Sequence, residues 1–306
     1  MKKYSGAAII VALFVTALVA AAAVAMITRL RIDVRRTELL INNQQAELYA
    51  QGSLYWAIDQ LNNDWNKKQP NQVIDKTPIT SPTKTMGNAK ITSIIYDAQG
   101  RFNLNNLKDN SYRENFLHLL QTAVPNLPTN EAQTILVAAI EWLSPPTMAS
   151  PFTEYYAKQN PPYRAAHRLF FSMSELRLVK GMTPAIFAAI EPLIIALPET
   201  TTININNAPA SVLRCLSPTL TEPAAKTILL YEKATPFATT QSFLNFAVVK
   251  NNPIPENKIT TSSSYFLVQS DVEIGTQHVT LYTLLHRTLK NGKSTMVIVW
   301  QSKGTL

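Results

Sequence analysis

Hydrophobic residues are concentrated near the amino-terminal end of the chain. The segment from Ala7 to Ile27 runs for 21 residues without a charge, a proline or a glycine. At 1.5 Å of rise per residue, a helix of that length reaches roughly 31 Å, the thickness of the hydrocarbon layer of a membrane. The pattern therefore predicts one membrane-spanning helix at 7–27, preceded by a short leader at 1–6 that contains two lysines.

A helical period continues beyond this apolar segment. Seven apolar residues recur at spacings of seven, seven, seven, three, three and four: Val34, Ile41, Leu48, Tyr55, Ile58, Leu61 and Trp65. Such a stripe is typical of an amphipathic helix, and the chain has no proline before Pro70. We therefore expect one long helix with a membrane half at 7–27 and an amphipathic half at 28–68. A cleaved secretory signal, with a small-residue site near Ala21–Ala23, is the alternative interpretation.

Strand patterns surround a block of helical patterns. Residues 67–88 predict a loop, and the runs 89–96 and 101–104 predict a hairpin around a turn. Runs of β-branched and aromatic residues near the carboxyl end predict three strands, at 264–274, 277–287 and 295–301. Apolar periods and cap residues predict helices at 112–123, 130–143, 174–179, 184–196, 209–216, 222–234 and 241–246.

This order of elements predicts an α+β fold. An antiparallel sheet formed from 69–104 and 248–306 accompanies the long helix, and 105–247 forms a large all-helical insertion. Such an insertion is tolerated where its two ends lie close together.

Composition excludes several kinds of catalytic site. The chain has eight glycines, no two within five positions of each other, so neither a dinucleotide-binding fingerprint nor a P-loop exists. A single cysteine, Cys215, excludes an internal disulfide and multi-cysteine zinc sites, and we expect an inert thiol in the core. The four histidines form no HExxH motif and no GxSxG occurs, so we do not expect an enzyme.

Charge adds information about location. Only 16% of the residues are charged, against about 25% in an ordinary soluble domain, which indicates that part of the chain is not in water. Lysines before the apolar segment favour a cytoplasmic leader, although four arginines between 29 and 36 follow on the other side.

Two segments of the helical block, near 174–184 and 203–237, have the form of helix-hairpin-helix units found in nucleic-acid-binding proteins. A DNA-binding surface needs an excess of basic residues, yet 174–250 carries six positive and five negative side chains. We therefore expect no nucleic-acid partner. A membrane-anchored helix-hairpin-helix protein of DNA uptake is the alternative function.

The leader is short and basic and ends in Gly6, and it resembles the class III signal of type IV pilin-like proteins. The resemblance implies that a prepilin peptidase cuts between Gly6 and Ala7 and that the new terminus is methylated. Most pilin-like proteins carry Glu at the fifth mature position, where this chain has Val11. Because that carboxylate pairs with a neighbouring subunit in the membrane, its loss implies a subunit with no neighbour above it.

A series of motifs, taken in order, resembles the K-class minor pseudopilins of type II secretion systems. It comprises Arg36-Thr37, Gln45-Ala46, Tyr49-Ala50, Gly100 to Leu107, Glu141-Trp142-Leu143, Pro161 to Tyr163, Ser174 to Gly181, Leu197-Pro198 and Ile203 to Ala208. Each motif alone is weak, but their order and spacing are specific.

The resemblance implies a type IV pilin-like core with a helical insertion of helix-hairpin-helix or SAM-like units. It also implies a tip subunit, anchored by one span in the bacterial inner membrane with its carboxyl-terminal domain in the periplasm. Such a subunit primes the pseudopilus and supports export across the outer membrane. The implied partners are minor pseudopilins of the I and J classes, the major pseudopilin and the inner-membrane assembly platform. The residues expected to pack on partner helices are Val34, Ile41, Leu48, Tyr55 and Ile58.

One departure from the family pattern concerns calcium. K-class proteins usually have an acidic calcium-binding stretch after the tryptophan, but here Ser144-Pro145-Pro146 follows Leu143. Calcium takes six to eight oxygen ligands, several of them carboxylates. Only Glu141 and Glu154 are candidate ligands, so we expect a weak or lost site.

Overall fold

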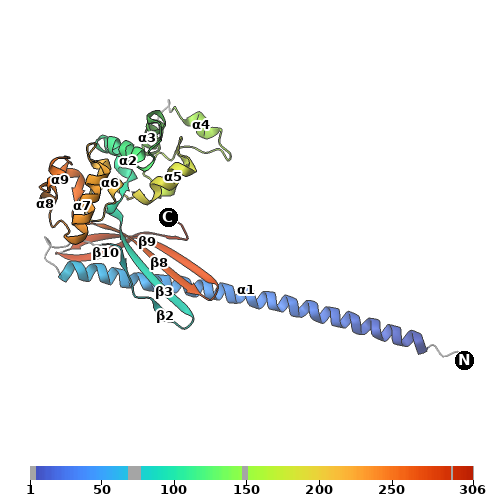
Figure 1. The fold of residues 1–306 in the computed structure, drawn as a ribbon. Helices are drawn as coiled ribbons and strands as arrows, with labels where there is room; N and C mark the ends of the chain where they lie inside the picture. The colour runs from blue at the N-terminus through green and yellow to red at the C-terminus, as the bar shows by residue number, and fades with distance from the viewer. Residues whose placement is uncertain (1–4, 68–76, 147–150, 291, 306) are drawn as a thin grey trace.

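The structure, a computed structural model, describes residues 5–67, 77–146, 151–290 and 292–305. It has three parts (Figure 1): a long helix, an antiparallel sheet along the far half of that helix, and a helical domain beyond the sheet. The predicted combination of long amino-terminal helix, antiparallel sheet and helical domain is confirmed.

The long helix, α1, runs from Ser5 to Lys67 and contains 63 residues, which makes it roughly 95 Å long. Every residue from 7 to 38 is exposed, and Arg35 donates a hydrogen bond of 3.3 Å to Thr276, in a turn between two strands of the sheet. After residue 38, one face packs against the sheet through small and aliphatic side chains: Ala46, Ala50, Leu54, Ala57 and Leu61. The alanines allow the helix axis to lie close to the strands.

The sheet has the order β1-β3-β8-β9-β10, with β2 also paired to β3, and all of these pairs are antiparallel. Its strands are β1 (Ile79–Thr80), β2 (Lys84–Met86), β3 (Ala89–Asp97), β8 (Tyr265–Ile274), β9 (Gln277–Lys290) and β10 (Lys293–Lys303). The three strands predicted near the carboxyl end are confirmed. Alternate residues of β3 are buried, as a half-buried strand requires.

Two expectations around β3 were wrong. The predicted hairpin of 89–96 with 101–104 does not form, because β3 pairs with β1 and β2 on one side and with β8 on the other. Asp97 caps a single 3-10 turn, Ala98–Gly100, which directs the chain out of the sheet. The expected loop at 67–88 contains β1 and β2 in the part of it that the structure describes.

The helical domain is inserted between β3 and β8. Its helices are α2 (Arg113–Ala123), α3 (Thr129–Leu143), α4 (Thr153–Ala157), α5 (Pro184–Ile190), α6 (Ala210–Leu216), α7 (Glu222–Ala234), α8 (Thr240–Leu244) and α9 (Ala247–Lys250). They surround one core, to which Val249, Ile254 and Ile259 also belong, so the helical domain continues beyond residue 247.

The helix expected at 184–196 ends early. It stops at Ile190 and is followed by a 3-10 turn at Glu191–Leu193 and a two-residue strand. Pro192 has no N–H to donate to the preceding turn, which explains this end. The segment expected as a helix at 174–179 is a 3-10 helix, Met173–Leu178.

Candidate functional site: the protruding helix and the domain junction

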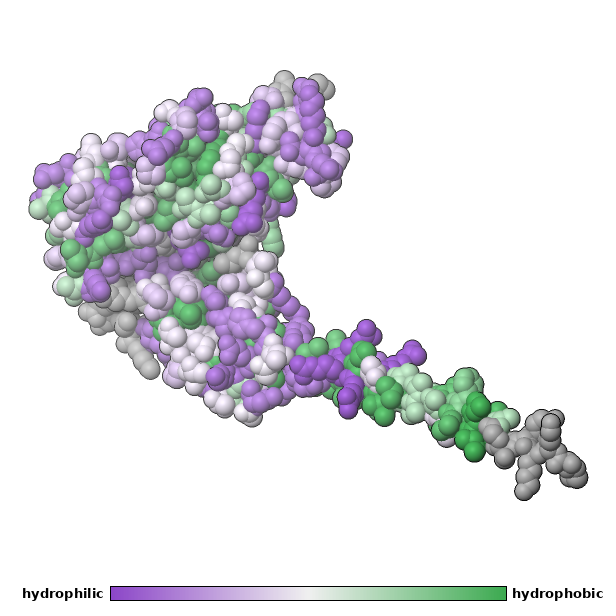
Figure 2. All heavy atoms as spheres, turned by 45° about the vertical axis from the view of Figure 1, so that its right-hand side comes forward, coloured by the Kyte–Doolittle hydropathy of each residue, from purple (hydrophilic) through white to green (hydrophobic). Residues whose placement is uncertain are grey.

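The first functional feature is the half of α1 that leaves the body of the molecule. In the described part of the chain, α1 is the helix long and apolar enough to span a membrane, with a mean hydropathy of 2.8 in its most apolar window. Figure 2 shows a hydrophobic outer part of this helix and a hydrophilic band where it joins the body. The four arginines between 29 and 36 are exposed and follow the apolar segment of this helix.

The predicted processing residues lie at the free end of this helix. Gly6 and Ala7 are in its first turn, and Val11, in the protruding half, is 61% exposed. No side chain of the described residues packs over this end, because residues 7–38 are all exposed. The end of the helix is therefore open to a membrane or to another subunit.

The predicted partner-packing stripe lies opposite the face that packs on the sheet. Residues 48 and 55 are about 180° around the helix from Ala50 and Ala57, at 100° per residue. Val34, Ile41, Leu48 and Tyr55 are 59%, 57%, 66% and 74% exposed. Ile58 differs, because it is half-buried against the cluster of α1 and sheet residues. The amphipathic half of α1 therefore has an internal apolar face and a separate external one.

The second feature is the junction where the chain enters and leaves the helical domain. The carboxylate of Asp97, at the end of β3, is buried. Its Oδ2 accepts hydrogen bonds of 2.7 Å from Asn204, Asn207 and Ser263, and its Oδ1 accepts one of 2.8 Å from the N–H of Gln99. This carboxylate joins the sheet to the second half of the helical domain.

Gln99 completes the junction. Its Oε1 accepts from the N–H groups of Ser264 and Tyr265, at the start of β8, and its Nε2 donates to the carbonyl of Thr202. The two ends of the insertion are thus held side by side by side chains of one turn. These bonds connect the start and the end of the insertion to the sheet that packs on α1.

An asparagine motif occurs twice in the helical domain. Asn103, Asn105 and Asn106 alternate with Phe102, Leu104 and Leu107, and the same order recurs 101 positions later with Asn204, Asn206 and Asn207. Each motif begins in a two-residue strand of a parallel pair, β4 (Phe102–Asn103) with β5 (Ile194–Ile195) and β6 (Ile203–Asn204) with β7 (Ile259–Thr260). In both, the first asparagine accepts from the N–H two residues on.

The two motifs also make equivalent long-range contacts. The Asn105 side chain accepts from the N–H of Phe170 and donates to its carbonyl, and Asn206 does the same with Phe237. A capped turn starts two residues after each phenylalanine, at Ser172 and Thr239. The helical domain is therefore built from two similar units.

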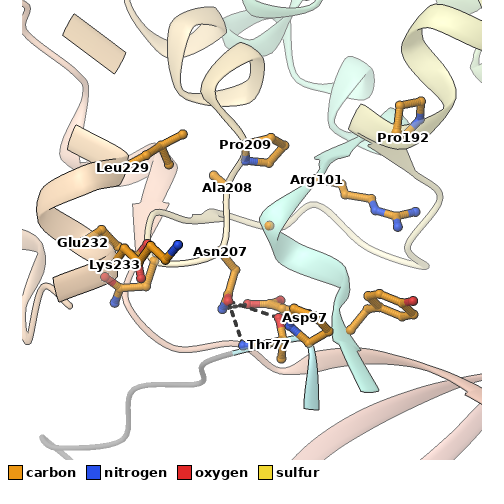
Figure 3. Close-up of a pocket in the computed structure, with 14 residues that line it drawn as sticks. Thr77, Asp97, Arg101, Pro192, Asn207, Ala208, Pro209, Leu229, Glu232 and Lys233 are labelled. Atoms are coloured by element: carbon orange, nitrogen blue, oxygen red, sulfur yellow. Dashed lines mark hydrogen bonds between the residues drawn. The ribbon is translucent and has the colours of Figure 1, made fainter. Parts of the chain in front are cut away.

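A pocket of 510 Å³ lies where the two units meet the sheet. Figure 3 shows Asn207, Asp97 and Thr77 joined by hydrogen bonds on its floor, with Arg101 and Pro192 on one side and Leu229, Glu232 and Lys233 on the other. Burial lowers the pKa of the Arg101 guanidinium, while Tyr96 and Glu191 act in the opposite direction. Gly100 also lines the pocket, and a Cβ at this position would meet the carbonyl oxygen of Asn207 at 2.6 Å, so the close approach of the two backbones requires glycine.

Within the part of the chain that the structure describes, the two candidate calcium ligands are not part of an acidic cluster. Glu141 is half-buried on α3, and the exposed Glu154 on α4 forms an ion pair with Lys158. No group of three or more His, Cys, Asp or Glu side chains suited to a metal occurs among the described residues. Glu154 is therefore engaged with a cation of the chain itself.

Two buried groups have structural roles. Cys215 is fully buried, as expected, and burial raises the pKa of its thiol to about 12. The Lys258 ammonium donates to the carbonyl of Ser111 and to Asn115 Oδ1, and burial lowers its pKa. These contacts tie the end of the helical domain to its first helix.

The asparagine repeat and the Asp97 junction were not predicted as a functional unit. Their signal in the sequence is the repeated alternation of an apolar residue with asparagine at 102–107 and 203–208. The long-range contacts themselves join residues 31 to 166 positions apart, which local patterns do not reveal.

Comparison with known proteins gives a consistent result. Two family models match, both described as type II secretion system (T2SS) protein K, one over residues 100–199 and the other over 203–262. Together they cover just over half of the chain, and each coincides with one of the two asparagine units.

Individual relatives match over most of their length. The type II secretion system protein K of Pseudomonas aeruginosa is 27% identical, over 94% of this chain and 90% of that protein. The protein of the same name from Klebsiella pneumoniae is 29% identical over 78% of each. The GspK-GspI-GspJ complex of enterotoxigenic Escherichia coli contains a chain of the same fold, with a TM-score of 0.74 and 21% identity. The match covers 89% of this chain and 100% of that one.

Proposed function

The chain belongs to the type II secretion system protein K family, and from that premise we propose that it caps the pseudopilus as its tip subunit. In this role it is a minor pseudopilin that primes assembly of the pseudopilus and supports export of proteins across the outer membrane. In this role the protein acts by assembling with other subunits and not by catalysing a reaction. The observation that carries the proposal is a 63-residue helix with an exposed apolar half and a sheet packed along its other half, with the helical domain beyond that sheet.

The position at the tip is supported by both ends of the molecule. The helical domain lies beyond the sheet, toward the end of α1 farthest from its amino terminus (Figure 1). A domain in this place would obstruct the addition of a further subunit. At the other end, Val11 stands where most pilin-like subunits have a glutamate. Because an unpaired carboxylate in a bilayer is unfavourable, a subunit without a neighbour above it gains by lacking one.

The expected partners are minor pseudopilins of the I and J classes. One related solved structure is a complex of GspK with GspI and GspJ, and a chain in it has the fold described here. The exposed stripe at Val34, Ile41, Leu48 and Tyr55 offers a helix-packing surface for them. Ile58 contributes from the side where α1 meets the sheet. The major pseudopilin and the inner-membrane assembly platform are the further partners of this role.

The anchor belongs in the inner membrane with the carboxyl-terminal part in the periplasm. A prepilin peptidase would cut between Gly6 and Ala7, and Ala7 would be methylated. The proposed parts are then the leader at 1–6, the membrane half at 7–27, the amphipathic half at 28–68, the sheet core at 69–104 and 248–306, and the helical insertion at 105–247. The core membership of Val249, Ile254 and Ile259 argues for a longer insertion, to about residue 259.

A deletion strain tests the proposal. Removal of the gene from a bacterium with a type II system should abolish release of a secreted enzyme, and the full-length chain should restore it. A tagged full-length chain, solubilised from membranes, should copurify with the I-class and J-class pseudopilins. Normal secretion in the deletion strain, together with failure to copurify either protein, would contradict the proposal.

A further inference from the structure

Position 52 lies on the exposed side of α1, and no contact within the described chain explains why it is a glycine. A Cβ built on it meets no atom of the described residues within 4 Å. By contrast, a Cβ on Gly100 would meet a backbone oxygen at 2.6 Å, and Gly181 has a φ of +87°. Glycine in the middle of a helix is less favourable than alanine because it loses more backbone entropy. An unfilled glycine at this place leaves room for a group outside the chain to approach the helix backbone.

Gly52 also lies within the external stripe of α1. It follows Leu48 by four residues and precedes Tyr55 by three, so the three positions share one face of the helix. Leu48 and Tyr55 are 66% and 74% exposed. The stripe thus has a large side chain above and below a position that has none.

Beside Gly52, a hollow of 290 Å³ separates α1 from the β2–β3 hairpin. Its walls are mainly apolar: Leu48, Tyr49, Gly52 and Trp56 come from α1, Pro82 from the segment before β2, and Met86 and Ile91 from the hairpin. Lys84 and three serines also line it. Met86 is 51% exposed on β2, the strand at this edge of the sheet. The hollow therefore extends the apolar surface of the external stripe from α1 to the hairpin.

The shape and position of this surface favour a helix as its occupant. The stripe repeats every seven residues, which is the spacing that keeps one helix in contact with another. It begins at Val34, just beyond the apolar segment of α1, so a helix that follows it would also come from the membrane. Small residues let two helix backbones approach closely, as Gly52 permits here.

We propose that the hollow between Gly52 of α1 and Met86 of β2 receives an apolar side chain from the long helix of a neighbouring pseudopilin. That helix runs parallel to α1, and its closest approach is at Gly52. The inference rests on the proposed function, because it takes the neighbour to be another membrane-anchored pseudopilin. It adds the β2–β3 hairpin to the contact, which a packing of α1 stripes alone does not include.

Site-specific photocrosslinking in the full-length chain tests the hairpin contact. A photoreactive phenylalanine analogue replaces Tyr55, Met86 or Leu230 in cells that contain the other minor pseudopilins, and adducts are identified with antibodies to those proteins. Leu230, on α7, is the matched control because it is 72% exposed and lies in the helical domain. We expect the same pseudopilin to be captured from position 55 and position 86, and none from position 230.

The outcomes separate the inference from the proposed function. Capture from position 55 without capture from position 86 overturns the hairpin contact and leaves the proposed function standing. Failure at both positions, in a chain that also does not copurify with the minor pseudopilins, overturns both.

Substitution of the glycine gives an independent test. Gly52→Leu should fill the space through which the partner helix comes close to the backbone of α1, while the chain stays folded. The adduct yield from position 86 should fall by about tenfold or more. Gln133→Leu adds the same side chain at an exposed position of α3, in the helical domain and away from the stripe, and should leave the yield unchanged. Gly52→Ala should raise the melting temperature of the isolated chain by about 2 °C while lowering the yield. Equal yields for wild type and Gly52→Leu would overturn the inference.

Discussion

Asn105 holds the backbone of Phe170 at both of its polar groups. The side-chain oxygen of Asn105 accepts from the Phe170 N–H at 2.8 Å, and its Nδ2 donates to the Phe170 carbonyl at 2.9 Å. The same Nδ2 also donates to the carbonyl of Leu197. Because Asn206 repeats this arrangement with Phe237, the helical domain depends on two equivalent buried amides.

Replacement of Asn105 by alanine should destabilise the first unit. The Phe170 N–H and carbonyl and the Leu197 carbonyl would lose a buried partner, and the expected loss of unfolding free energy is roughly 3 kcal/mol. The ring of Trp142 stacks on Phe170 with centroids 6.2 Å apart, so tryptophan fluorescence in a urea titration reports on this unit. Asn126→Ala, at an exposed position, is the control and should change stability by less than about 0.5 kcal/mol. Equal midpoints for the two variants would show that the Asn105 contacts are not important for stability.

Substitution of Asp97 by asparagine should loosen the junction between the sheet and the helical domain. Asn204, Asn207 and Ser263 all donate to Asp97 Oδ2, and an amide nitrogen in that place cannot accept from them. We expect a loss of roughly 2–4 kcal/mol. Limited proteolysis of the full-length chain should then cut faster near 98–101 and 260–264. Asp33→Asn, on the exposed part of α1, serves as the control, and similar cleavage rates in both variants would refute the role of Asp97.

Local patterns were sufficient for the long helix and for the strands near the carboxyl end. The apolar run at 7–27 and the stripe from Val34 to Trp65 require only the helical period, and β8 to β10 require only strand alternation. The β3 hairpin was mispredicted because the side chain of Asp97 redirects the chain, and its partners come from residues more than 100 positions away. The hollow at Gly52 depends on how the β2–β3 hairpin meets α1, which no local pattern specifies.

Burial of neutral groups makes the fold sensitive to alkali. Burial raises the pKa of Cys215, Tyr112 and Tyr156 to about 12 each. The folded state therefore favours the protonated forms, whose stabilisation is complete below the unfolded pKa values of about 8.5 to 10 and is lost as the pH rises toward 12. We expect cooperative unfolding between about pH 10 and 12, with tyrosinate absorbance and circular dichroism changing together. Ionisation of all tyrosines near pH 10 without loss of structure would contradict this assignment.

The burial of Cys215 also predicts slow chemical modification of its thiol. At pH 8.5 we expect alkylation to be about 100-fold slower in the native chain than in urea.

Calcium should have little effect on stability. Glu141 and Glu154 do not belong to an acidic cluster in the described chain, and Glu154 is paired with Lys158. We expect melting temperatures in calcium and in a chelator to agree within about 1 °C, since a ligand that does not bind the folded state cannot stabilise it. A rise of several degrees with calcium, abolished by Glu141→Gln, would reverse this expectation.

The mature amino terminus tests the central claim most directly, because processing before the apolar helix distinguishes a pseudopilin from a secreted domain. The chain is purified from membranes of a bacterium that has a prepilin peptidase, and its terminus is determined by intact mass and sequencing. A chain that begins at Ala7 and carries one additional methyl group is the predicted result. A terminus between Ala22 and Met26, or an unprocessed Met1, would contradict the account.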